Sequence, residues 1–124
     1  MRRHWIEKFR YALRGIRHGS RGQSSFQIHV PAAFLVVTLA AVLRCSLWQF
    51  CTLGLCIAMV LGLELVNSSI ECLARGLCSE RNTDVGQALD IASGAVLVVS
   101  AIAAIIGAAV LGTQAFIQLG QLQL

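Results

Sequence analysis

Apolar residues dominate three long stretches of this chain, at residues 26–43, 47–77 and 85–116. A helix needs roughly 20 predominantly apolar residues to cross a hydrocarbon core about 30 Å thick. A single helix over residues 30–63 would be about 50 Å long, which is too long for one crossing, so we expect the chain to turn near residues 44–46. The pattern therefore predicts three transmembrane helices over the three apolar ranges.

The first 21 residues show a different pattern, in which apolar and basic residues alternate at helical spacing. This pattern is typical of an amphipathic helix that lies in the membrane interface, with basic side chains toward the lipid phosphates. The residues on the apolar arc are Trp5, Ile6, Phe9, Ala12, Leu13 and Ile16. We therefore expect an all-α membrane protein, with this surface helix followed by three transmembrane helices in a single domain over residues 1–124.

Composition supports a membrane protein, because 56% of the 124 residues are hydrophobic and only 13% are charged. A soluble domain of this length would expose far more charge. Three thin helices bury little surface in isolation, so we expect several copies of the chain to assemble. The five cysteines show neither a CxxC spacing nor a His-rich metal spacing, which favours structural thiols.

The basic residues predict the orientation in the membrane. Seven of the ten lie before the first apolar run, Arg75 and Arg81 follow the second, and only Arg44 lies between the first two runs. The positive-inside rule then places the N-terminus and residues 75–84 in the cytoplasm, and the C-terminus outside the inner membrane. These charges belong to a membrane-anchored segment, which disfavours nucleic-acid binding.

Three polar residues share one face at the end of the second apolar run. On a helix, the spacing of Glu64, Asn67 and Glu71 places their side chains within about 60° of one another. Carboxylates at membrane depth are costly, so such a cluster indicates a functional site, although polar contacts between helices or a headgroup position remain alternatives. The other polar candidates expected at this membrane face are Gln23, His29 and Asp90.

These residues resemble the small prokaryotic diacylglycerol kinase and undecaprenol kinase family. The most specific part is the pattern Glu64-x-x-Asn67-Ser68-x-Ile70-Glu71, followed nineteen residues later by Asp90. The resemblance covers about residues 5–110 and implies a homotrimer of three-span subunits. It also implies a lipid kinase that uses Mg²⁺ and ATP to phosphorylate the hydroxyl of a membrane lipid. The weaker N-terminal matches are Phe9-x-Tyr11-Ala12-x-x-Gly15 and Phe26-x-Ile28-His29.

The same resemblance implies individual roles. Glu64 would be the general base beside the lipid hydroxyl, and Glu71 would bind Mg²⁺ and nucleotide. Asn67 would orient phosphate or base, and Asp90 would support the nucleotide site. Tyr11 would lie near the adenine, or else serve only as an interfacial aromatic residue.

Three positions depart from the family pattern. Gln23 stands where a second metal-binding glutamate is usual, Arg75 replaces an aspartate and Leu89 replaces a lysine. A glutamine oxygen can still coordinate Mg²⁺ with less charge, and Arg75 can either pair with Glu71 or reach a phosphate. These departures keep a catalytically impaired, kinase-derived membrane subunit as an alternative.

A small membrane transporter with an essential glutamate is the other alternative. Such transporters place a single glutamate deeper in the membrane and lack the companions Asn67, Glu71 and Asp90. His29 is interpreted as a polar residue at a helix start rather than as a ligand. The choice between diacylglycerol and undecaprenol stays open, because smooth lipid-facing surfaces leave no motif.

Overall fold

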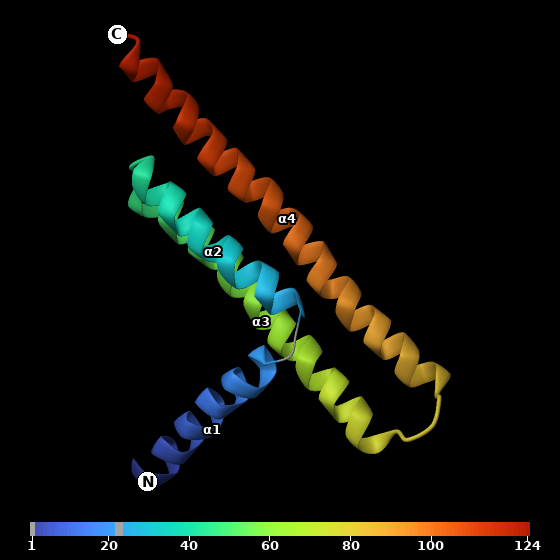
Figure 1. The fold of residues 1–124 in the computed structure, drawn as a ribbon. Helices are drawn as coiled ribbons and strands as arrows, with labels where there is room; N and C mark the ends of the chain where they lie inside the picture. Colours follow the sequence, from blue (N-terminus) through green and yellow to red (C-terminus); the bar gives the residue numbers. More distant parts are fainter. Residues whose placement is uncertain (1, 22–23) are drawn as a thin grey trace.

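The computed structural model describes residues 2–21 and 24–124, which form four helices and, within those ranges, no strand (Figure 1). The helices are α1 (Arg2–Ser20), α2 (Ser24–Val42), α3 (Leu47–Leu77) and α4 (Thr83–Leu122). By length and composition, α2, α3 and α4 are each apolar enough to cross a membrane. The all-α fold with three candidate spans, predicted from the sequence, is therefore confirmed.

The turn between α2 and α3 lies where the sequence predicts it. Arg44 adopts a left-handed conformation with φ 55°, and the N–H of Cys45 donates to the carbonyl oxygen of Ala40 at 3.0 Å, which closes the end of α2. Ser46 then starts α3, because its hydroxyl accepts from the N–H of Gln49 and the Gln49 side chain accepts from the N–H of Ser46. These contacts reverse the chain, so that α3 runs back beside α2.

The start of α4 differs from the prediction. The segment 84–87 resembles a capping box, but the helix already begins at Thr83, since Asn82 Oδ1 accepts from the N–H groups of Asp84 and Val85. Asp84 thus lies in the first turn, where a negative charge interacts favourably with the helix dipole. The helix also continues to Leu122, beyond the predicted end at residue 116, and is about 60 Å long at 1.5 Å per residue.

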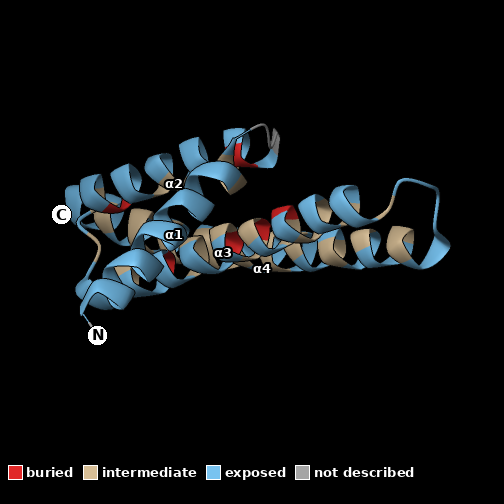
Figure 2. Cartoon of the chain, turned by 90° about the horizontal axis from the view of Figure 1, so that it is seen from below, coloured by how far each residue is buried: buried red, intermediate tan, exposed pale blue. Residues whose placement is uncertain are grey.

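The helices pack around α3, which contacts α4 most extensively and also contacts α2 and α1 (Figure 1). Few residues are buried within one chain, as Figure 2 shows by the scarcity of red segments. Many large apolar side chains stay exposed, including Phe34 at 72% and Leu97 at 71%. Lipid or other protein chains must cover this surface, because exposing so large an apolar area to water is unfavourable. In the described part of the chain, the buried apolar residues are Phe26, Ala40, Leu53 and Val60.

Helix α1 leaves the bundle at a steep angle and meets α3 at its own C-terminal end (Figure 1). The contact is close, because a Cβ added at Gly19 would lie 2.7 Å from Leu65 Cδ2. Ser68 lies one helical turn after Glu64 on α3. Its hydroxyl donates to the carbonyl oxygen of Gly19 at 3.3 Å. The end of the surface helix is therefore fixed beside the polar cluster of α3.

A polar network joins the three long helices at the opposite end of the bundle. Gln49 Nε2 donates to Gln114 Oε1 at 3.2 Å, and Gln114 Nε2 donates to the carbonyl oxygens of Leu43 at 3.0 Å and Arg44 at 3.4 Å. These carbonyls belong to the turn between α2 and α3, directly after the C-terminal end of α2. Gln114 thus ties α4 to both α2 and α3.

We expect replacement of Gln114 by leucine to destabilise the protein by about 0.5–1.5 kcal/mol, because the two carbonyls and the Gln49 amide would lose a partly buried partner. The measurement is the midpoint of thermal unfolding in one detergent. The exposed Gln121 on the same helix provides the matched control, as Gln121→Leu. Equal midpoints for the two variants would show that the network contributes nothing to stability.

Candidate functional site

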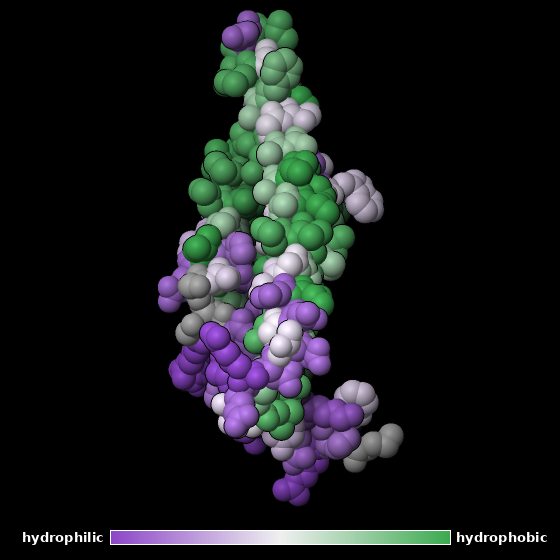
Figure 3. Space-filling model, turned by 90° about the vertical axis from the view of Figure 1, so that its right-hand side faces the viewer, coloured by the Kyte–Doolittle hydropathy of each residue, from purple (hydrophilic) through white to green (hydrophobic). Residues whose placement is uncertain are grey.

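Polar side chains gather at one end of the molecule, on the face seen in Figure 3, around α1 and the loop between α3 and α4. Glu71 lies six residues before the end of α3, and Asp90 lies seven residues after the start of α4. Both positions are therefore about 10 Å along their helices from the loop, and Glu64 is about 20 Å from it. Glu71 and Asp90 therefore lie at similar distances from the loop on antiparallel helices, and Glu64 lies about two turns farther from it.

Among the described residues, Glu64 is the most deeply buried polar one, with 3% of its surface exposed. Its Oε1 is hydrogen-bonded to Nδ1 of His29, which reaches it from the first turns of α2. Its second oxygen, Oε2, is buried and has no hydrogen-bond partner among the described residues. A buried carboxylate with an unsatisfied oxygen is costly, which favours a functional role at this position over a structural one.

A ladder of polar contacts continues along α3 toward the loop. Asn67 Nδ2 donates to Glu71 Oε1 at 2.9 Å, and Glu71 Oε2 lies 4.0 Å from Nη1 of Arg75. The ion pair between Glu71 and Arg75, one of the two roles expected for Arg75, is thus present. The pair is weak, because Arg75 is 71% exposed and water screens it. Arg75 therefore remains available to a phosphate, and Asn67 keeps a buried oxygen, Oδ1, without a partner.

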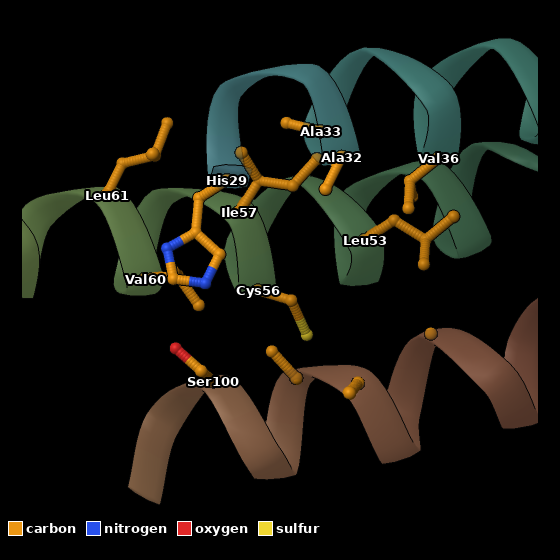
Figure 4. Close-up of a pocket in the computed structure, with 13 residues that line it drawn as sticks. His29, Ala32, Ala33, Val36, Leu53, Cys56, Ile57, Val60, Leu61 and Ser100 are labelled. Atoms are coloured by element: carbon orange, nitrogen blue, oxygen red, sulfur yellow. The ribbon is translucent and has the colours of Figure 1, made fainter. Parts of the chain in front are cut away.

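Three cavities surround these groups. A cavity of about 290 Å³ between α2, α3 and α4 is lined almost entirely by apolar side chains, with the His29 ring pointing into it and Ser100 on the facing wall (Figure 4). A groove of about 940 Å³ separates α1 from α3 and includes Ser68 and Arg75. A third cavity, of about 440 Å³, lies between α3 and α4 and includes Glu71, Arg75 and Arg81.

The structure does not bring all the predicted residues together. Asp90 is exposed, and it is Leu89 that lines the cavity beside Glu71. Tyr11 is 60% exposed on α1, where the Arg14 guanidinium lies 5.7 Å from its ring centre, and it lines none of the three cavities. Gln23 lies outside the described residues. The structure therefore pairs Glu64 with His29 and Asn67 with Glu71.

The fit to Mg²⁺ depends on Glu71. In the described part of the chain, no three His, Cys, Asp or Glu side chains converge as a cage for a metal ion. Kinases, however, usually hold Mg²⁺ with one or two carboxylates and the substrate phosphates, and they leave the remaining positions to water. Glu71 is 30% exposed and lines the cavity that Arg75 and Arg81 also line, so it fits such a site.

His29 is the functional candidate that sequence reasoning undervalued. His29 and Glu64 are 35 positions apart in the sequence and belong to different helices. The periodicity within one helix therefore cannot predict their contact. The available signal was its place in the weak motif Phe26-x-Ile28-His29, at the same expected depth as Glu64.

Comparison with known proteins identifies the family. The sequence profile described as prokaryotic diacylglycerol kinase matches residues 10–111. A diacylglycerol kinase from Synechocystis is 31% identical over 107 residues, which cover 86% of this chain and 61% of that protein. An undecaprenol kinase from Bacillus subtilis is 31% identical over 103 residues, which cover 83% of this chain and 84% of that protein.

The matched region contains α2, α3 and most of α4, together with the glutamate cluster described above. This chain spans less than two thirds of the Synechocystis relative and most of the Bacillus relative. The two relatives are named diacylglycerol kinase and undecaprenol kinase, in agreement with the resemblance found in the sequence. The chain belongs to the prokaryotic diacylglycerol kinase family, a family of membrane-embedded lipid kinases.

Proposed function

We propose that this chain transfers the γ-phosphoryl group of ATP to the hydroxyl of a membrane lipid, either diacylglycerol or undecaprenol. The observation that carries the proposal is the buried Glu64 carboxylate, which has one oxygen on His29 and the other unpaired. The reaction needs a proton acceptor for the lipid hydroxyl at membrane depth, and a carboxylate oxygen without a hydrogen-bond partner among the described residues supports Glu64 in that role. The lone glutamate expected of a transporter lacks the companions Asn67 and Glu71 found here.

In the proposed reaction, Glu64 Oε2 takes the hydroxyl proton as the lipid oxygen forms its bond to the γ-phosphorus. The bond between that phosphorus and the bridging β,γ-oxygen breaks, and ADP leaves. Arg75 and Arg81 line the cavity beside Glu71, where they can hold phosphate oxygens. Glu71 would bind Mg²⁺, which neutralises phosphate charge, and Asn67 Nδ2 keeps the Glu71 carboxylate in place.

The decisive experiment uses the purified chain with Mg²⁺, γ-labelled ATP and one lipid at a time. Label in diacylglycerol or in undecaprenol would establish the activity and choose the substrate. Reactions without lipid, and with a chelator, provide the controls. A protein that binds MgATP yet labels neither lipid would overturn the proposal in favour of a kinase-derived membrane subunit.

We also propose a homotrimer in the inner membrane with the N-terminus in the cytoplasm. The extensive exposed apolar surface of the single chain supports assembly, and the resemblance to the family supports three copies. The excess of basic residues in α1 and around Arg75 and Arg81 supports the orientation.

The orientation predicts the result of reporter fusions. A reporter at residue 2 or residue 81 is expected on the cytoplasmic side, and one at residue 122 on the opposite side, because three spans separate the two ends. A fusion at residue 44 is the internal control for the first turn and is also expected outside. A cytoplasmic C-terminus would contradict the three-span orientation and would place Glu64 and Asp90 at unrelated depths.

A further inference from the structure

The contact between His29 and Glu64 links the start of α2 to the polar face of α3. Glu64 is 3% exposed and His29 is 28% exposed, and the His29 ring enters the cavity between α2, α3 and α4 (Figure 4). A carboxylate only accepts hydrogen bonds, so Nδ1 must carry the proton of the shared bond. The chemistry of the pair thus defines which nitrogen donates.

The consequence for Glu64 is a fixed orientation. One oxygen is occupied by His29, and the remaining oxygen, Oε2, is buried without a partner in the described part of the chain. A glutamate side chain has three rotatable bonds. Restricting them to one conformation costs conformational entropy, and a charge-assisted hydrogen bond offsets that cost. Without the bond, the carboxylate would be free to rotate away from its substrate.

We propose that His29 is a positioning residue, which holds Glu64 through Nδ1–H···Oε1 so that Oε2 faces the lipid hydroxyl. The inference rests on the proposed kinase function and adds a residue whose role is to orient the base. Reaction rates depend steeply on such placement, and a displacement of 1 Å can lower a rate by about 10²-fold. The imidazole does not contact the substrate and acts only through Glu64.

Three substitutions separate this role from general packing. His29→Ala removes the donor, His29→Asn places an amide N–H near the position of Nδ1, and His29→Gln places its amide near the position of Nε2. We expect kcat to fall by about 10²-fold in His29→Ala and His29→Gln, and to be largely restored in His29→Asn. The KM for MgATP should not change in any of them, because Glu71 and Arg75 lie two to three turns farther along α3. Gln27→Ala, at an exposed position on the same helix, is the matched control.

A double variant tests whether His29 acts through Glu64. In the Glu64→Gln background, His29→Ala should cause no further loss of kcat, because the carboxylate it orients is already absent. A structural role would instead add its loss to that of Glu64→Gln and would raise the KM for MgATP. The midpoint of thermal unfolding is measured for every variant, and His29→Asn carries the test if His29→Ala fails to fold.

The outcomes are distinguishable from failure of the kinase function itself. If the parent protein labels neither lipid, the kinase proposal fails before His29 is examined. If the parent is active, a parental kcat in His29→Ala would overturn the positioning role. A His29→Asn variant as impaired as His29→Gln, despite parental stability, would overturn it too, as would additive losses in the double variant.

Discussion

Replacing Glu64 by glutamine is expected to lower the rate of lipid phosphorylation by about 10²–10⁴-fold. Glutamine keeps the size of the side chain and can still accept the hydrogen bond from His29, but it cannot take a proton from the lipid hydroxyl. The measurement is the steady-state rate with saturating lipid and MgATP. Binding of MgATP, followed separately, should stay at the parental level because Glu64 lies two turns from Glu71.

Stability should move in the opposite direction to activity in this variant. A neutral amide is less costly to bury than a carboxylate with one unpaired oxygen, so the thermal midpoint of Glu64→Gln should equal or exceed that of the parent. A variant that is both stable and nearly inactive would therefore assign a catalytic role to Glu64. Phosphorylation at the parental rate would exclude Glu64 as the general base.

Replacing Glu71 by glutamine is expected to act on metal and nucleotide instead. The half-saturating concentration of Mg²⁺ and the KM for MgATP should each rise at least about 10-fold, because a charged oxygen ligand is replaced by a neutral one. Phosphorylation is measured against free Mg²⁺ at fixed ATP, with Glu7→Gln on the exposed face of α1 as the control. An unchanged Mg²⁺ curve would show that Glu71 does not bind the metal.

The helices of this chain could be predicted because each apolar run, and each break between two runs, depends on residues that are close together in the sequence. Arg44 and Ser46 end one helix and start the next through contacts within a few residues. The start of α4 was predicted less well, since Asn82 and Asp84 are both good capping residues two positions apart. Local chemistry alone does not decide which of them caps the helix.

The site was predictable only as far as one helix contains it. The spacing of Glu64, Asn67 and Glu71 places them on one face of α3, and the Asn67–Glu71 contact lies within that face. The placement of Asp90 depends on how α4 is rotated about its axis, and a helix that is apolar all round gives no stripe to fix that rotation. The partner of Glu64 comes from α2, and only the packing of two helices reveals it.

The partly buried pair of Glu64 and His29 has a consequence for attempts to engineer this protein. Replacing a buried polar pair by well-packed apolar residues often leaves a fold equally or more stable, while removing only one partner leaves the other unsatisfied. A screen that selects only for a high midpoint of thermal unfolding would therefore favour variants in which both side chains are replaced. Selection for robustness in detergent and selection for turnover should diverge at these two positions before any others, so thermostabilised variants need an activity filter there.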